Sequence, residues 1–176
     1  MAHVVFLRAM NVGGKNVFRP AQLAAALAHL GAVNVGAAGT FVIRERVSAA
    51  LIRREILAGM TFKPELAVRP AGEILALVRS KPFDRATFSK DLRGWVAVLG
   101  ARPRNRPALP LSKPAGKAWS IRLERVDGAF ALGLWHRRPG GFLFPSQVVE
   151  DALGVRATTR WWETMERVAA LIEKPL

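Results

Sequence analysis

The chain has 176 residues, of which 51% are hydrophobic and 23% charged, so it can bury a core and lacks the composition of a disordered protein. It contains no cysteine, which excludes disulfides, thiolate catalysis and cysteine-ligated zinc and fits a reducing compartment. The net charge of +14 favours polyanionic partners, although an arginine-rich composition alone could also produce it.

The first half of the chain predicts alternating short strands and helices. Leucines at i, i+4 and i+7 predict a helix that begins at Pro20 and ends at Gly31, and a second amphipathic helix is expected over 47–57. A third helix, over 71–79, follows Pro70. Apolar, β-rich runs predict four strands, over 3–8, 32–35, 40–44 and 64–69.

The resulting order, β-α-β-β-α-β, is typical of a split βαβ or ferredoxin-like unit, an antiparallel sheet with both helices on one face. The uncharged stretch 20–43 is long enough to span a membrane. Its proline and glycines, and its switch from helical to strand periodicity, instead indicate elements of a soluble protein. No signal peptide is expected either, because Arg8 interrupts the first apolar run. We therefore expect a cytoplasmic protein.

The second half repeats this pattern less regularly. A strand is expected over 94–100, and a hairpin over 117–135 that turns at Asp127-Gly128. Helices are expected over 145–154 and over 159–174, the latter capped by Thr159. The predicted fold class is therefore α+β, with duplicated ferredoxin-like subdomains. The predicted domains are 1–80, a connector at 81–93, and 94–176 with a basic, proline-rich loop at 101–117.

The N-terminal segment FLRAMNVGGKNVF has part of the pattern of a nucleotide-binding loop. A Walker loop, G-x-x-x-x-G-K-[ST], uses backbone N–H groups to cradle phosphate and a hydroxyl to bind magnesium. Here Ala9 replaces the first glycine and Asn16 replaces the hydroxyl residue. The following helix starts at Pro20, too late for its N-terminus to face the loop. A nucleoside-triphosphatase is therefore not expected.

Two interpretations of this loop remain open. In the simpler one, Gly13 and Gly14 form a tight turn, and Asn11 and Asn16 hold the loop backbone. In the other, the glycine N–H groups form an anion nest beside Lys15. This second interpretation makes the loop a candidate anion-binding site, with the residues Arg8, Asn11, Gly13, Gly14, Lys15 and Asn16.

Two end motifs resemble a bacterial family known as domain of unknown function 1697. That family begins with L-R-G-I-N-V-G-G-K-N and opens its last helix with T-R-N-W-N-T. The segment FLRAMNVGGKN is similar to the first motif, and Thr159, Arg160, Trp162 and Thr164 match the second. The resemblance implies a duplicated ferredoxin-like α+β fold and no known reaction, and it adds Arg160 to the candidate anion-binding residues.

The chain departs from the family pattern at several polar positions. Ala9 stands where the family has glycine, and Ala38-Gly39-Thr40 stands in place of a serine-glycine-asparagine hairpin. Trp161 and Glu163 each replace an asparagine of the final motif. The chain resembles a divergent member that keeps the N-terminal loop but loses side-chain amides elsewhere.

A second candidate site is the basic segment in the middle of the chain. Residues 92–123 contain no acidic residue, and Trp95 and Trp119 lie within them. Alternating arginine and proline favours extended, exposed guanidinium groups that suit phosphate contacts; a solvated loop without function is the alternative. The candidate nucleic-acid-binding residues are Arg102, Arg104, Arg106, Lys113 and Lys117.

The aromatic pair Trp161-Trp162 precedes the last helix. Adjacent helical positions point about 100° apart, so only one of the two can lie squarely on the core face. Trp162 aligns with Met165 and Ala169 and is expected in the core, while Trp161 is expected at its rim.

The sequence shows no complete catalytic constellation. His3, His29 and His136 lack metal-binding spacing, so neither a metal nor a cofactor is expected. The leading hypothesis is a non-catalytic protein that binds an anionic ligand, either nucleic acid or a phosphorylated metabolite. The alternative is a small-molecule enzyme with a cleft between the subdomains, where Arg8, Lys15, Arg160 and Glu163 would converge. A third interpretation is that both end motifs only stabilise the fold.

Overall fold

The computed structural model describes residues 2–8, 19–83, 88–139 and 143–174. Within these residues the chain is an α+β protein with two antiparallel sheets, of four and five strands, and five α-helices. It divides into two compact units, one made of residues 1–80 and 163–176 and the other of residues 81–162. None of the described helices is long and apolar enough to cross a membrane.

The first unit has the element order predicted from the sequence. Its sheet order is β2-β3-β1-β4, and each neighbouring pair is antiparallel. Pro20 begins the first helix, as predicted, but this α-helix ends at Ala26, and Gly31, with its left-handed φ of 60°, ends the short 3-10 helix that follows. The elements are β1 (His3–Leu7), α1 (Pro20–Ala26), the short 3-10 helix η1 (Ala28–Leu30), β2 (Ala32–Asn34), β3 (Thr40–Ile43), α2 (Ala49–Ala58), β4 (Leu66–Pro70) and α3 (Ala71–Arg79), with α5 (Trp162–Glu173) from the C-terminus.

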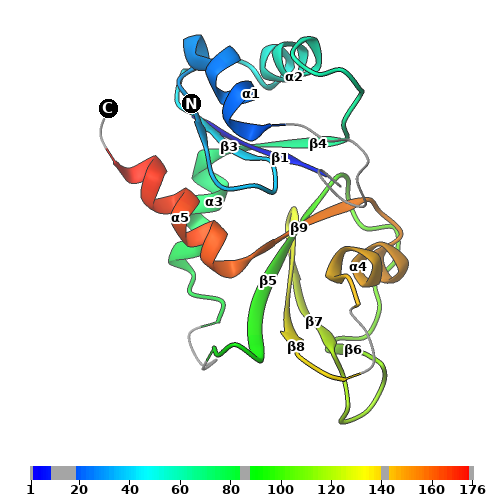
Figure 1. The fold of residues 1–176 in the computed structure, drawn as a ribbon. Coiled ribbons are helices and arrows are strands. Elements are labelled where there is room, and N and C mark those ends of the chain that lie inside the picture. Colours follow the sequence, from blue (N-terminus) through cyan, green and yellow to red (C-terminus); the bar gives the residue numbers. More distant parts are fainter. Residues whose placement is uncertain (1, 9–18, 84–87, 140–142, 175–176) are drawn as a thin grey trace. The chain divides into compact units, whose positions relative to one another are not determined.

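Both faces of this sheet are buried. On one face, α1 and α2 pack against alternate strand residues, including Val5 and Phe41, as predicted. The opposite face carries Val4 and Phe6, which are also fully buried, and Figure 1 shows α3 and α5 on this side of the sheet. A hydrogen bond of 3.3 Å from Arg44 Nη2, just beyond β3, to the Leu171 carbonyl connects α5 to the sheet.

The second unit is built on the five-stranded sheet, in the order β6-β7-β8-β5-β9. The predicted hairpin turn is confirmed, because Gly128 adopts a φ of 56° between β7 and β8. The helix predicted to begin at Pro145 and end before Gly154 is also confirmed. The elements are β5 (Leu92–Leu99), β6 (Leu111–Lys113), β7 (Ile121–Asp127), β8 (Phe130–His136), α4 (Pro145–Leu153) and β9 (Ala157–Trp161).

Two strands of this unit were not predicted. The sequence suggested a helix over 159–174 with Thr159 as its cap, but Thr159 lies in β9, where it pairs with Ala97 of β5. The helix begins only at Trp162. The other strand, β6, lies inside the proline-rich segment and pairs with β7. Both strands form because they pair with another strand, and the local pattern of apolar residues does not indicate such pairing.

The core of the second unit lies between the sheet and α4. Trp95, Ile121 and Leu123 point to the side where α4 contributes Val149 and Leu153. On the other face, the rings of Phe83 and Phe88 pack edge-to-face with centroids 5.5 Å apart. Trp162 adds a third ring, 5.2 Å from Phe83, and is buried, as predicted.

Candidate functional site

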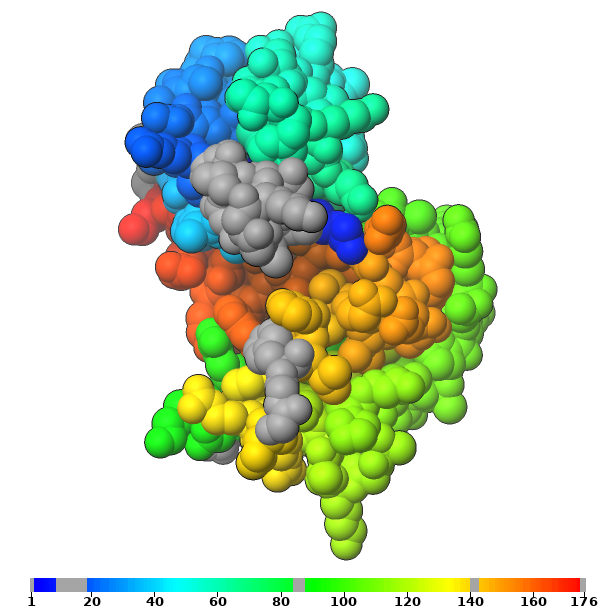
Figure 2. Space-filling view, turned by 45° about the vertical axis from the view of Figure 1, so that its right-hand side comes forward, coloured from blue at the N-terminus to red at the C-terminus, as the bar shows by residue number. Residues whose placement is uncertain are grey.

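The basic segment, residues 101–117, lies between β5 and β7 on the surface of the second unit. All five of its candidate side chains are exposed, and the stretch 92–123 contains no acidic residue. In Figure 2 the yellow-green atoms around residues 100–120 lie at the surface of this unit. The exposed cations are Arg102, Arg104, Arg106, Lys113 and Lys117.

The backbone of this segment is attached to the unit at several points. The N–H groups of Arg104 and Asn105 both donate to the Leu153 carbonyl at the end of α4, at 2.9 and 3.2 Å. Further along, Lys113 accepts a 2.8 Å hydrogen bond from the Ser120 N–H group. The backbone is therefore held in place while the charged side chains extend into solvent, which lowers the entropy cost of binding a ligand.

An arginine and an aromatic ring stack at the C-terminal end of the segment. The guanidinium carbon of Arg122 lies 4.6 Å from the centroid of the Trp119 ring, and the His136 ring lies 5.5 Å from the same ring. Arg122 Nε also donates to a carboxylate oxygen of Glu124. The Trp119 side chain is half-buried, so part of the indole remains accessible to solvent.

Arg138 joins the same cluster from the end of β8. Its Nε donates to the Trp119 carbonyl at 3.3 Å, and its Nη2 donates to the Lys117 carbonyl at 3.4 Å. These bonds hold the turn before β7 against the residues that follow β8. The sequence alone does not place Arg138 or His136 beside Trp119, because their proximity depends on the pairing of β7 with β8.

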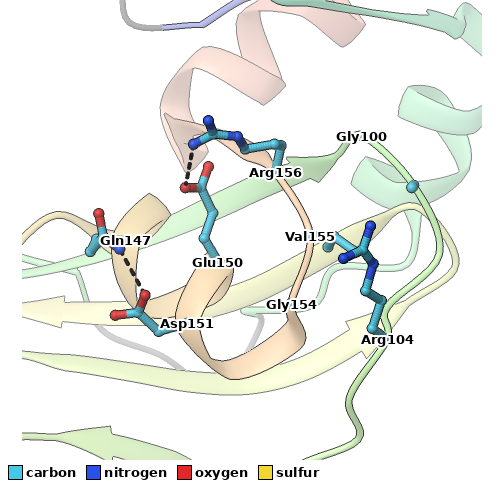
Figure 3. Close-up of a pocket in the computed structure, with 9 residues that line it drawn as sticks. Gly100, Arg104, Gln147, Glu150, Asp151, Gly154, Val155 and Arg156 are labelled. Carbon is cyan, nitrogen blue, oxygen red and sulfur yellow. Dashed lines mark hydrogen bonds and ion pairs between the residues drawn. The ribbon is translucent and has the colours of Figure 1, made fainter.

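A pocket of about 510 Å³ lies beside the first part of the basic segment. Figure 3 shows Glu150 and Asp151 projecting from α4 on one side and Arg104 on the other. Its lining residues are Gly100, Ala101, Arg104, Gln147, Glu150, Asp151, Gly154, Val155 and Arg156.

The acidic residues of this pocket already have partners within the protein. Glu150 accepts a 2.9 Å hydrogen bond from the Ala157 N–H group and forms an ion pair of 3.5 Å with Arg156. Gln147 Nε2 donates to Asp151 at 2.8 Å. Glu150 therefore ties α4 to the start of β9, and we assign the carboxylates of this pocket to the stability of the fold.

The candidate anion-binding loop near the N-terminus is represented by one described residue, Arg8. Its N–H group donates to the Glu65 carbonyl at 2.9 Å, and Arg8 Nη1 lies 3.6 Å from Glu65 Oε2. A carboxylate of the same unit thus lies next to this guanidinium. The other residues predicted for this loop, Asn11, Gly13, Gly14, Lys15 and Asn16, lie outside the described residues.

Arg160 lies in β9 of the second unit, with only 6% of its surface exposed. Its Nη1 donates to Thr158 Oγ1 at 3.0 Å and to the Thr159 carbonyl at 2.8 Å. Burial lowers the pKa of the guanidinium from its ordinary value to about 10, because a charged group loses hydration inside the protein. The side chain is therefore still protonated at neutral pH.

Trp161 and Trp162 occupy different surroundings. Trp161 is half-buried, with the guanidinium carbon of Arg93 4.0 Å from its ring centroid and the Trp135 ring 5.7 Å away. The predicted rim position of Trp161 is therefore confirmed. The Arg93 guanidinium lies over this ring.

The two-sheet α+β fold defines the structural class of this chain. The conserved bacterial protein SP0830 from Streptococcus pneumoniae shares this fold, with a TM-score of 0.59 over 98% of each chain and 14% sequence identity. The family model of DUF1697, described as a protein of unknown function, matches residues 1–124. The chain therefore belongs to the DUF1697 family, as its motifs suggested. None of the curated proteins matches it.

Proposed function

We propose that the two units are copies of one split βαβ unit and that the second copy acquired the basic segment. The sheet order β7-β8-β5-β9 of the second unit corresponds to β2-β3-β1-β4 of the first. In this correspondence α4 is equivalent to α2, and α5 follows β9 as α3 follows β4.

The first copy has a helix, α1, between its first two strands. At the equivalent position, between β5 and β7, the second copy has the basic segment and β6. A helix that buries an apolar face is thus replaced by a surface segment rich in proline and arginine. This replacement supports a role beyond stabilising the core, since the segment contributes few apolar groups.

We further propose that the basic segment binds nucleic acid in the cytoplasm, without catalysis. The observation that carries this proposal is a run of five exposed cations on an anchored backbone with no acidic residue among them. Exposed guanidinium and ammonium groups pair with phosphates, and a nucleic acid offers several phosphates in a row. A single small metabolite could contact only a part of such a segment.

The test is fluorescence anisotropy with labelled oligonucleotides across a salt series. The variant Arg102→Gln/Arg104→Gln/Arg106→Gln should weaken binding and lower the slope of log K against log salt by about 2 to 3, since each lost phosphate contact lowers it by roughly 0.7 to 0.9. The matched control removes the same charge from exposed arginines of the first unit, Arg46, Arg53 and Arg54. It should retain most of the affinity.

Three results would contradict the proposal. Absence of binding at low salt would make the net charge of +14 a matter of composition. Equal losses in the two triple variants would show that overall charge, and not the basic segment, attracts the ligand. Binding of a phosphorylated metabolite without oligonucleotide binding would favour the small-ligand hypothesis.

A further inference from the structure

Two tryptophans lie within the acid-free stretch that contains the basic segment, but only one is accessible. Trp95 is fully buried, and its ring packs against Gly133 inside the core. Trp119 is half-buried at the end of the segment, two residues before β7. A ligand that follows the basic segment would therefore meet the indole of Trp119.

The surroundings of Trp119 are those of a stacking surface. The guanidinium of Arg122, 4.6 Å from the ring centroid, and the indole form two layers of π surface, and both side chains are partly exposed. Arg138, through its bonds to the carbonyls of Trp119 and Lys117, fixes the backbone that carries the ring. Aromatic rings and guanidinium planes are the groups on which proteins stack unpaired bases.

The charge around this ring is mostly positive. Lys117 precedes Trp119 by two residues, Arg122 lies over the ring, and Arg138 donates a hydrogen bond to the Trp119 carbonyl. Glu124 is the acidic group of the cluster and pairs with Arg122. Phosphates next to a stacked base would thus lie close to cations, with Glu124 partly compensating Arg122.

From these contacts we infer that Trp119 and Arg122 form a stacking platform for an unpaired base, so that the ligand is single-stranded nucleic acid. This inference rests on the proposed function of the basic segment and adds the class of nucleic acid to it. A duplex hides the faces of its bases inside its own stack, and only a single strand can offer them to the platform.

The experiment compares single-stranded, duplex and abasic oligonucleotides of equal length by anisotropy. Trp119→Leu should lower the affinity for the single strand about tenfold and leave the salt slope unchanged, because no phosphate contact is lost. Trp119→Phe should keep most of the affinity, since it retains a ring. The abasic strand should bind more weakly and should not respond to Trp119→Leu.

The controls separate this inference from the function on which it rests. Arg125→Gln removes a charge from the same strand, where Arg125 pairs with Asp127, and should leave single-strand binding within about twofold. Equal binding of the single strand by wild type and Trp119→Leu, or stronger binding of duplex than of single strand, would overturn the platform while leaving the basic segment intact. Absence of binding to any oligonucleotide would overturn the proposed function itself.

Discussion

The indole of Trp95 lies directly against the backbone of Gly133, its pairing partner across β5 and β8. A Cβ atom at position 133 would lie 2.3 Å from Cζ2 of the indole and 2.1 Å from the carbonyl oxygen of Arg122. Neither the ring, which is fully buried, nor the backbone of β7 has space to move. The absence of a side chain at 133 thus determines how the largest core residue of the second unit is placed.

We therefore expect Gly133→Ala to lower the free energy of unfolding by about 2 kcal/mol or more, as overpacking of a close-packed core does. The matched control is Gly72→Ala in α3, where nothing lies within 4 Å of the added Cβ. It should instead raise stability by about 0.5 to 1 kcal/mol. Urea unfolding of both variants measures these differences, and similar values for the two would contradict the proposed contact.

The cap of α2 gives a second prediction. Ser48 accepts a 3.1 Å hydrogen bond from the Leu51 N–H group, one of the N–H groups that a helix leaves without an internal partner. Ser48→Ala should lower the free energy of unfolding by about 1 kcal/mol, and Ser48→Asp should retain it. Thermal unfolding of the two variants tests this, and an unchanged midpoint for Ser48→Ala would show that the cap has no effect on stability.

The ion pair between Arg79 and Glu173 links the ends of α3 and α5 at 2.9 Å, but both side chains are largely exposed. Water and salt screen such pairs, so Glu173→Gln should change the free energy of unfolding by less than about 0.5 kcal/mol. A loss above 1 kcal/mol in urea unfolding would show that this pair, despite its exposure, holds the last helix in place.

The buried Arg160 predicts a pH dependence above the physiological range. Its pKa is about 10 in the folded protein and returns to its higher, ordinary value on unfolding. Between these values the unfolded state binds more protons, so the free energy of unfolding rises with pH; below about pH 10 both states are protonated and the contribution is constant. The stability difference between wild type and Arg160→Met should therefore be level from pH 7 to 9. It should then move in favour of wild type by about 1 kcal/mol from pH 10 to 11.

Charge reversal at Arg104 should affect oligonucleotide binding without affecting the stability of the fold. Its side chain is exposed, and the contact that anchors the segment comes from its backbone N–H group. Arg104→Glu should weaken oligonucleotide binding several-fold and change stability by less than about 0.5 kcal/mol. A clearly lower free energy of unfolding for this variant, or an oligonucleotide affinity equal to that of wild type, would contradict the prediction.

Much of the first unit could be predicted because its signals are local. Pro20 and Gly31 mark the helical segment through their own backbone preferences, and the same logic located α4 between Pro145 and Gly154. The turn at Gly128 is equally local. Such features depend on a few neighbouring residues, which the sequence displays directly.

The rest depends on partners that are distant in the sequence. Thr159 resembles a helix cap because a helix does follow it, but its pairing with Ala97 makes it part of a strand. The burial of Arg160 could not be predicted either, since arginine is usually exposed. The cluster around Trp119 forms only when β8 places His136 and Arg138 beside the start of β7.

The edge strand β6 has a consequence for solubility. An exposed sheet edge offers free N–H and C=O groups on which another chain can add a strand, a common start of aggregation. Here the edge strand has three residues and is followed at once by Pro114, while Pro110 precedes it. Proline has no N–H group to donate, so a docking strand would find a template only three residues long. The segment that presents positive charge to a ligand thus also limits strand addition at this edge of the sheet.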